Sequence, residues 1–470
     1  MELYMAYMTK SERKTLLIAS CTASAVTPMT GSMMNLSLPG IGAAFEIGAH
    51  SLAYVNTIFL LSSVIFMVPV SRIADIYGRK KIFMTGLVIH IIAAIGGYFS
   101  LSYSMLLGFR FLMGLGTAGM ATTAITMLTD AFPPSERGGA IGLNTASVYM
   151  GLSIGPVLGG FINDLFSWRE VFLLTAPLVT VALIAISRIK ADSIDDGAKK
   201  FDIIGTVLYV SAVALTMIGL IYLPEFMAFA LIAVGLMLFV LFFKYEKNTD
   251  SPVLSVWIFS YKVFRRSSIA SFLINTANFS VLFFISLYLQ EIGQLTPSQA
   301  GFVILSQPLV QAALTTYFGK LHDRISDKRV LPTAGVMITL IAVIMMMSLS
   351  MNPNLGLVIA SLMLFGLGNA VFNAPNTTTM MSSVLPKDRG SASATVAVVR
   401  QMGMAVSMAI AMGTISIIMG SLDTIGPSTY GDFVTVIHIS FIISAIMCVV
   451  AMLVSWFRGD CSAEGASITE

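Results

Sequence analysis

Long apolar runs alternate with short polar connections along the whole chain. Each run is long enough to cross about 30 Å of hydrocarbon as an α-helix. The pattern therefore predicts an all-α membrane protein with about fourteen spans. We expect these spans near residues 15–40, 52–70, 82–101, 104–128, 139–161, 171–187, 203–222, 226–243, 267–289, 298–318, 330–349, 355–380, 391–418 and 433–457.

The composition agrees with this prediction. Hydrophobic residues make up 56% of the 470 residues and charged residues 11%, whereas a soluble domain carries about a quarter charged residues. The connections are too short for a soluble domain, and no catalytic cluster or nucleotide-binding loop is evident. An enzyme or a sensor is therefore the weakest alternative. The three cysteines are scattered, so we expect no disulfide framework, no metal site and no cofactor.

The lysines and arginines predict the orientation in the bilayer. If the N-terminus is cytoplasmic, all but three of the 27 basic residues fall in cytoplasmic segments. The exceptions are Arg169 in an outer connection and Arg110 and Arg400 within spans. This asymmetry follows the positive-inside rule. It predicts a multi-pass protein of the cell membrane with both termini in the cytoplasm, and we expect a monomer without a nucleic-acid partner.

Three short segments recur about 250 residues later in the chain. "SRIADIYGRKK" at 71 is echoed by "GKLHDRISDKR" at 319, "FLMGLGTA" at 111 by "MLFGLGNA" at 363, and "PPSERGGA" at 133 by "LPKDRGSA" at 385. Such an ordered repeat predicts a duplicated bundle, with a substrate path where the repeats meet. We divide the chain into a six-helix bundle (1–187), two additional helices with linkers (188–262), a second six-helix bundle (263–457) and a cytoplasmic tail (458–470).

The connection "SRIADIYGRKK" carries five charges and a glycine between two uncharged runs. Its basic residues could serve only as a topological anchor. That interpretation does not explain Asp75, which weakens a basic signal, or Gly78, which permits a tight turn. A carboxylate at the membrane edge can pair with an arginine or with a helix N-terminus. A functional role for this connection is therefore a stronger hypothesis than a topological anchor alone.

The segment resembles the loop-two signature of the major facilitator superfamily, with Asp75, Gly78, Arg79 and Lys80 at matching positions and Ser71 in place of the usual glycine. The resemblance implies the major facilitator fold: two six-helix bundles related by a pseudo-twofold repeat, here with two extra central helices. It also implies that these four residues belong to a conformational gate between the halves. Asp323 and Arg324 of the second-half echo would be its other side.

Arg110 lies inside the predicted fourth span. A charged side chain in lipid costs at least about 2.5 kcal/mol on insertion scales, so an arginine there is a functional candidate unless it reaches the outer interface. With Gly114 it forms an Arg-x-x-x-Gly pattern. This pattern resembles the fourth-span motif of the same superfamily, and the resemblance implies a part for Arg110 in proton coupling.

Span five carries glycines at a spacing of four residues in "MGLSIGPVLGGF". Gly151, Gly155 and Gly159 would form a flat stripe that permits close helix approach, and Pro156 can bend the span. General helix packing is the alternative to a specific function. Together with Gly160, the Gly-Pro-x-x-Gly-Gly sequence resembles the antiporter motif of the fourteen-span drug:proton antiporters. The resemblance implies export by exchange.

The predicted spans contain amides but no acid near their middle. Titratable candidates are limited to Asp130, Glu291, His90 and His438, and Thr30 stands where many fourteen-span drug exporters have an aspartate. Substrate-path candidates are Thr30 and Asn35 in span one and the amides Asn275, Asn278, Gln307, Gln311, Asn369, Asn373 and Asn376. Helix packing is the alternative for these amides. Without a central acid, neutral or anionic amphiphiles are an alternative to cationic drugs.

These observations predict a secondary active transporter that works by alternating access. Its expected substrates are drugs or other amphiphilic small molecules, exported in exchange for protons. The alternative is a facilitated or differently coupled transporter of a metabolite or a lipid-like anion.

Overall fold

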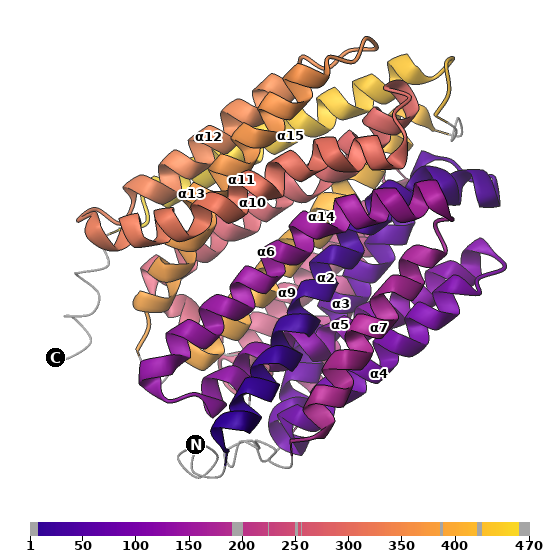
Figure 1. Ribbon diagram of the computed structural model, residues 1–470. Coiled ribbons are helices and arrows are strands. Elements are labelled where there is room, and N and C mark those ends of the chain that lie inside the picture. Colours follow the sequence, from indigo (N-terminus) through magenta and orange to yellow (C-terminus); the bar gives the residue numbers. More distant parts are fainter. Residues whose placement is uncertain are drawn as a thin grey trace. The chain divides into compact units, whose positions relative to one another are not determined.

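The computed structural model describes residues 8–189, 201–223, 225–249, 252–254, 256–385, 389–420 and 425–459. This part of the chain contains fourteen long α-helices (Figure 1). They are α2 (Lys10–Phe45), α3 (Ala49–Tyr77), α4 (Arg79–Tyr98), α5 (Tyr103–Ala131), α6 (Pro134–Leu165), α7 (Glu170–Ser187), α8 (Ile203–Ile221), α9 (Phe226–Glu246), α10 (Lys262–Leu287), α11 (Pro297–Arg324), α12 (Val330–Met346), α13 (Leu355–Ser382), α14 (Arg389–Met419) and α15 (Tyr430–Trp456). A 3₁₀ turn (Val256–Ser260) precedes α10, and a π turn (Tyr288–Ile292) extends it.

The helices coincide with the predicted spans. Eleven of them, within the described residues, are long and apolar enough to cross a bilayer. The helix α12 is apolar but somewhat shorter, and α2 and α11, which are less apolar, are not among the eleven. Both still lie where spans were predicted, at 15–40 and 298–318.

The chain divides into two compact units. Unit 1 comprises Met1–Glu46, Tyr54–Thr216 and Leu231–Val253, and unit 2 comprises Ile47–Ala53, Met217–Ala230 and Leu254–Glu470. The pair α8 and α9 is thus divided between the units. The domain boundaries proposed from the sequence remain a prediction.

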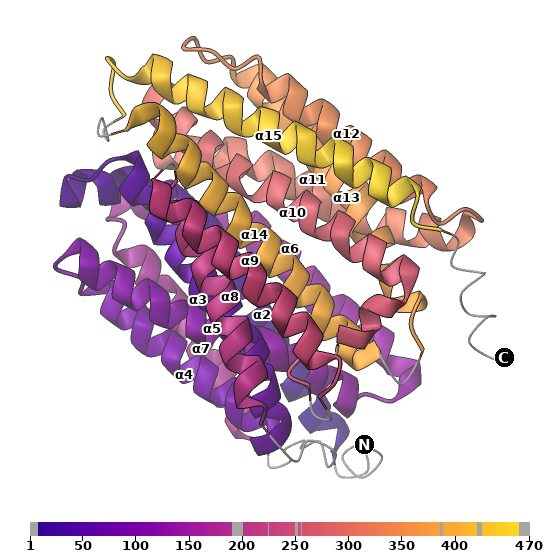
Figure 2. The same ribbon diagram turned by 180° about the vertical axis from the view of Figure 1, so that it is seen from behind.

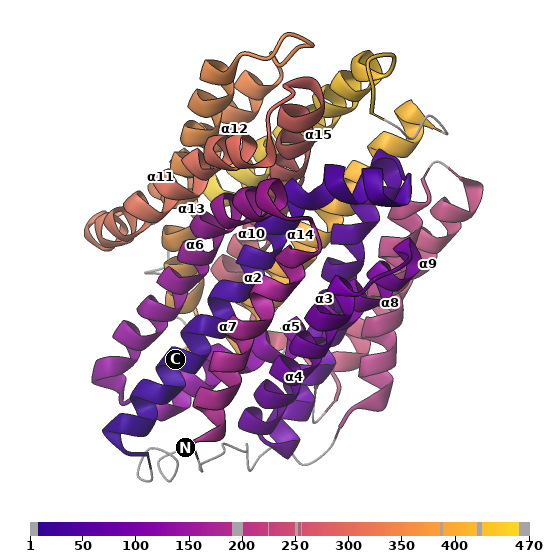
Figure 3. The same cartoon turned by 45° about the vertical axis from the view of Figure 1, so that its right-hand side comes forward.

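Within each unit the helices pack in the same order. In unit 1, α2 lies beside α6 and α7, and α4 lies beside α5 and α7 (Figures 1 and 3). In unit 2, α10 lies beside α14 and α15, and α12 lies beside α13 and α15. The same set of pairings recurs in helices of the same rank, as expected of a duplicated bundle.

Close glycine contacts recur at the same places in the two units. In unit 1, a Cβ at Gly86 would lie 2.7 Å from the carbonyl oxygen of Gly116. In unit 2, a Cβ at Gly335 would lie 2.9 Å from the carbonyl oxygen of Gly368. Because backbone faces backbone, no side chain can be accommodated at either crossing without moving a helix. Two further close contacts recur in the same way. Gly114 faces Phe59 in unit 1, as Gly366 faces Gln307 in unit 2. Gly151 faces Ala25 in unit 1, as Gly403 faces Phe272 in unit 2.

A single residue separates α3 from α4. Gly78 has φ 113° and ψ 125°, a conformation that side-chain-bearing residues rarely adopt. Its backbone N–H still donates to the carbonyl oxygen of Ala74 at 3.0 Å, and its own carbonyl oxygen accepts from the N–H of Ile82 at 3.2 Å. The tight turn expected from the sequence is therefore present, and it places the charges of the two helix ends next to one another.

The first part of α8 is attached to α3 within unit 1. The Tyr209 hydroxyl, on a fully buried ring, donates to the carbonyl oxygen of Val64 at 2.9 Å. The ring also packs against Phe242 of α9, with centroids 5.6 Å apart. Figure 2 shows α8 and α9 from the side on which both are visible. Tyr209 thus attaches the helices α8 and α9 to α3 in unit 1.

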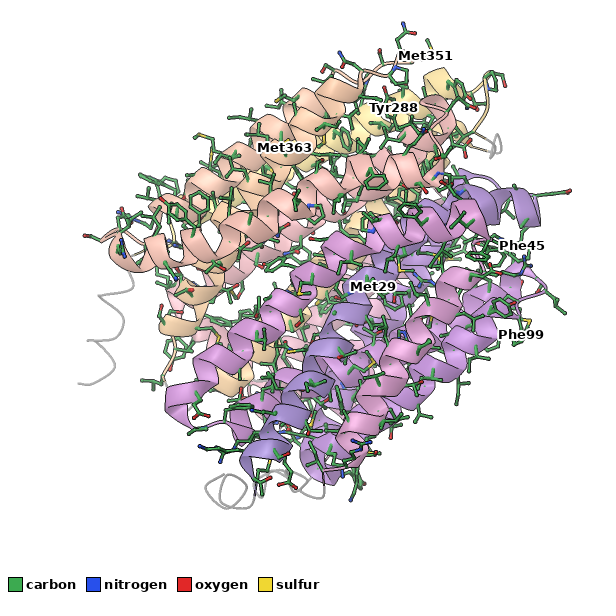
Figure 4. The ribbon with its side chains drawn as sticks, viewed as in Figure 1. Met29, Phe45, Phe99, Tyr288, Met351 and Met363 are labelled. Atoms are coloured by element: carbon green, nitrogen blue, oxygen red, sulfur yellow. The ribbon has the colours of Figure 1, made fainter. Side chains whose placement is uncertain are left out.

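An aromatic cluster lies at the C-terminal end of α2, at Phe45 (Figure 4). Phe45 packs against Trp168 with ring centroids 5.5 Å apart. The guanidinium of Arg169 lies 4.3 Å from the centroid of the Trp168 ring, and it donates to the carbonyl oxygen of Ser100 at 3.2 Å. Arg169 is the basic residue that the sequence placed on the outer side, and its cation–π contact gives it a structural role there.

Candidate functional site

A charged corner lies at the α3–α4 connection of unit 1, which we name the inner end of that unit. Arg79, the first residue of α4, donates from Nε at 3.0 Å and from Nη2 at 2.8 Å to Oδ1 of Asp75. Its Nη1 also contacts Oδ2 of Asp130, near the end of α5. Lys80 donates to the carbonyl oxygen of Ile189, just after α7. Arg79 and Lys80 thus connect the inner ends of α3, α4, α5 and α7.

The corner is partly withdrawn from solvent. The side chains of Arg79, Asp75 and Asp130 are 15%, 25% and 8% exposed. Removing one partner from a buried ion pair is far more costly than at the surface, because the remaining charge is left without solvation. Asp130 was named from the sequence only as a titratable candidate, and its place beside Arg79 was missed. Its one signal was an acid in the last turn of α5, whose other charged residue is Arg110.

The matching corner of unit 2 is built differently. Arg324 is exposed at the end of α11, and the side chain of Asp323 lies outside the described residues. Asp327 and Arg329 form a two-pronged ion pair with both N–O distances at 2.9 Å, and they are 35% and 36% exposed. The hydrogen bonds from Arg329 hold the pKa of Asp327 below its ordinary value.

A buried arginine follows α15 in unit 2. Arg458 has no exposed surface, and its guanidinium donates to Asn376 Oδ1 at 3.2 Å, to Thr379 Oγ1 at 3.3 Å and to the carbonyl oxygen of Lys328. Asn376 and Thr379 belong to α13, and Lys328 precedes α12. The arginine therefore joins the end of α15 to α13 and to the α11–α12 connection of unit 2. Sequence reasoning assigned it only to the basic residues of the cytoplasmic side.

Arg110 is fully buried inside unit 1. Its Nε donates to the carbonyl oxygen of Val55 at 2.9 Å, and its Nη2 donates to Asn56 Oδ1 at 3.1 Å. Asn56 in turn donates from Nδ2 to Asn35 Oδ1 at 2.7 Å, and the Phe59 ring centroid lies 4.5 Å from the guanidinium. An arginine reaching the outer interface would be exposed, so the snorkelling alternative does not fit this geometry.

The Arg110 contacts form a directed chain of hydrogen bonds. Arginine can only donate, so Asn56 must turn its oxygen towards Arg110 and its nitrogen towards Asn35. The chain crosses from α5 through α3 to α2, and it connects two residues predicted independently, Arg110 and Asn35. Asn56 was missed because a single asparagine in an apolar run gives no signal of its partners.

The glycine stripe of α6 packs against α2. A Cβ at Gly159 would lie 2.8 Å from Cα of Met33, and a Cβ at Gly155 would lie 3.0 Å from the carbonyl oxygen of Met29. Met29 is labelled in Figure 4, and Figures 1 and 3 show α2 and α6 side by side. Gly151 faces Ala25 in the same way. Pro156 and Gly160 are buried in the same helix.

Two amides on α6 add hydrogen bonds to this helix pair. Asn144 donates to Ser24 Oγ and Asn163 donates to Ser37 Oγ, each at 2.9 Å. The stripe and these bonds make the α2–α6 contact close and polar. Its role in exchange stays a prediction.

Most of the predicted path residues are engaged within their own unit. Thr30 is buried and donates to the carbonyl oxygen of Val26 at 2.8 Å. Gln307 donates to Gln311 at 2.7 Å, one turn along α11. Asn275 donates to Ser271 at 2.7 Å, and Asn278 donates to Asn369 Oδ1 at 2.7 Å. Asn373 is partly buried on α13, and no hydrogen bond of its side chain is found within the described residues.

The acids of the described helices lie in or next to the terminal turns, as expected from the sequence. Glu291 belongs to the π turn after α10, where the N–H of Gly293 donates to the carbonyl oxygen of Tyr288 at 2.9 Å. His438 contacts the carbonyl oxygen of Leu349 at 2.8 Å. His90 is fully buried on α4, and its ring nitrogens have no hydrogen-bond partner within the described part of the chain.

Comparison with known proteins gives transporters among the relatives of this chain. The riboflavin transporter RibZ of Clostridioides difficile (strain 630) is 27% identical over 84% of this chain and 86% of its own length. The multidrug resistance protein Stp of Mycobacterium tuberculosis (strain CDC 1551 / Oshkosh) is 27% identical over 80% of this chain and 71% of its own length.

Solved structures share the fold. A bacterial homologue of the human lysosomal transporter Spinster, in an inward-facing and occupied conformation, superposes with a TM-score of 0.69. The alignment covers 96% of this chain and 97% of that one at 17% identity. The fold class predicted from the sequence is confirmed. The family model described as Major Facilitator Superfamily matches residues 20–264 and 267–467, and the chain is therefore a multi-pass membrane transporter that belongs to this superfamily.

Proposed function

We propose that this transporter exports drug-like amphiphilic molecules in exchange for protons. The observation that carries the proposal is the buried chain from Arg110 through Asn56 to Asn35. A buried positive charge with no acid paired to it among the described residues attracts an anionic group that enters the site and lowers the proton affinity of groups beside it. The multidrug resistance protein Stp among the relatives supports the drug-export part.

The proposal includes a conformational gate and a cellular setting. Asp75, Gly78, Arg79 and Lys80 would hold one side of the gate, with Asp323 and Arg324 on the other, while two bundles alternate access to the substrate. Asp130 joins this set through its contact with Arg79. The protein would act as a monomer in the cell membrane with both termini in the cytoplasm.

The close α2–α6 contact is the second element of the proposal. Gly151, Gly155, Pro156, Gly159 and Gly160 would keep the two helices in contact during exchange, so that the site cannot leak protons between them. The supporting fact is that the stripe faces the backbone of α2 at three successive turns.

Proton coupling is tested with the purified full chain in proteoliposomes. Efflux of a fluorescent amphiphile is followed with and without an imposed pH gradient, in the wild type and in Arg110→Ala. We expect the gradient to accelerate transport in the wild type and to have no effect in the variant. The matched control is Arg265→Ala, an exposed arginine in the first turn of α10. Equal gradient dependence in the wild type and Arg110→Ala contradicts the proposal.

A second candidate function is transport of a metabolite without proton exchange. The acids at the helix ends leave no carboxylate in the middle of the described spans, and RibZ, a riboflavin transporter, is among the relatives. The same vesicles can be loaded with riboflavin. Riboflavin flux that does not depend on the pH gradient, together with no flux of the amphiphile, favours this candidate.

A further inference from the structure

An asparagine pair in unit 2 leaves one hydrogen-bond acceptor unused. Asn369 on α13 donates from Nδ2 to the carbonyl oxygen of Phe365, one turn earlier, at 3.0 Å. Its Oδ1 accepts from Nδ2 of Asn278 on α10 at 2.7 Å. The second polar atom of Asn278, Oδ1, is enclosed and has no partner among the described residues.

The orientation of the pair follows from its chemistry. If the Asn369 amide turned over, its nitrogen would face Asn278 and its oxygen would face the carbonyl oxygen of Phe365, which cannot donate. The bond to Phe365 therefore determines the orientation of Asn369, and Asn369 determines that of Asn278. The polar atom left over is an amide oxygen, not an amide nitrogen. The pair thus offers an unpaired acceptor, while each amide nitrogen already donates one hydrogen bond.

An enclosed acceptor without a partner is costly, because its desolvation is not offset by a hydrogen bond. Asn278 as a residue is only partly buried, on a helix that is otherwise largely buried. Asn369 is 6% exposed. A molecule that reaches Asn278 and brings an N–H or O–H group would therefore replace a missing interaction.

We propose that Asn278 Oδ1 is a substrate-binding acceptor that selects molecules carrying a hydrogen-bond donor. The ligand class is an amphiphile with an N–H or O–H group on its polar part, in preference to the same molecule with that group alkylated. Asn369 is a positioning residue, which acts by holding the Asn278 amide in one orientation. The inference rests on the proposed function, since it specifies what the exporter recognises.

The preference has a predictable size. A ligand without a donor leaves the acceptor desolvated and unpaired, whereas one with a donor forms a hydrogen bond there. We expect a ratio of dissociation constants of about tenfold between two ligands that differ only in this group.

A suitable pair of probes is rhodamine 123 and tetramethylrhodamine methyl ester. Both have the same ring system, the same ester and the same single positive charge, and only rhodamine 123 carries N–H groups. Binding of each dye to the purified full chain is measured by fluorescence anisotropy. Because the ratio is taken within one variant, a loss of folded protein affects both dyes equally.

We expect the wild type to bind rhodamine 123 about tenfold more tightly, once the ratio is corrected for partitioning of each dye into detergent. In Asn278→Leu the ratio should fall to about one. In Asn369→Leu both dyes should still bind with a reduced ratio, because the Asn278 amide can then turn over. The control is Gln290→Leu in the π turn that extends α10. The amide of Gln290 donates to Ser286 at 3.2 Å, and the ratio of this variant should equal that of the wild type.

Two results overturn the inference while leaving export intact. One is equal affinity of the wild type for the two dyes, and the other is an unchanged ratio in Asn278→Leu. Failure of the exporter proposal looks different: neither dye binds to the wild type or moves across vesicles that contain it. That result removes the inference as well.

Discussion

Replacing Asp130 by asparagine tests whether the inner corner of unit 1 is held by charge. The substitution keeps the shape of the side chain and one acceptor oxygen, and it removes only the negative charge. Asp130 is 8% exposed and Arg79 is 15% exposed, so the pair lies largely out of water. Arg79 retains its contacts with Asp75 at 2.8 Å and 3.0 Å, and the loss is therefore partial.

The expected cost follows from this burial. Breaking a fully buried ion pair by removing one partner costs about 3–5 kcal/mol. Because Asp75 remains beside Arg79, we expect about 2 kcal/mol for Asp130→Asn. The comparison is Asp327→Asn in unit 2, where both members of the pair are about one-third exposed. Surface pairs contribute about 0.2–1 kcal/mol, so this variant should lose less than about 1 kcal/mol.

The assay is thermal unfolding of each purified variant in the same detergent. For a unit of about 200 residues, 1 kcal/mol corresponds to about 2–4 °C. Asp130→Asn should therefore lower the midpoint by about 4–8 °C, and Asp327→Asn by much less. Arg79→Met combined with Asp130→Asn should be less destabilised than the sum of the two single variants, because they remove the same interaction. Equal shifts for Asp130→Asn and Asp327→Asn, or strict additivity, refute the reasoning.

Three further outcomes are expected. Gly151→Leu should destabilise unit 1 by about 1–3 kcal/mol or more, since its Cβ meets the backbone of α2, while Gly142→Leu on the same helix, where a Cβ meets nothing within 4 Å, should be nearly neutral in thermal unfolding. Arg458→Met should lower the free energy of unfolding by about 2–5 kcal/mol, because buried acceptors lose their donor. A smaller shift in the unfolding midpoint than that of Asp327→Asn contradicts this argument. The lowered pKa of Asp327 means that its ion pair stabilises the folded chain above the ordinary value near 3.8 and loses this effect as the pH falls through the lowered value. The midpoints of wild type and Asp327→Asn should therefore converge as the pH falls from about 6 to about 3, and a constant difference contradicts the assignment.

The span pattern, the repeat and the single-residue turn at Gly78 were readable from the sequence, because each depends only on the order of residues along the chain. Apolar length determines where a helix can cross a bilayer, and a glycine between two helices already indicates a turn that other residues resist. The recurrence of three segments about 250 residues apart also predicted a duplicated bundle. The packing of α2 with α6 and of α10 with α14 agrees with this expectation.

The partners of the polar side chains could be found only in the tertiary structure. Asp130 stands 51 residues from Arg79, Asn56 stands 54 residues from Arg110, and Asn369 stands 91 residues from Asn278. Helical spacing says which side chains share a face of one helix, but it does not say which neighbouring helix that face meets or at what height. Those depend on helix crossings, which close glycine contacts determine across the bundle. The sequence by itself therefore identified the kind of protein and many of its polar residues, while only packing decided which of them are paired and which buried atoms, Asn278 Oδ1 among them, have no partner among the described residues.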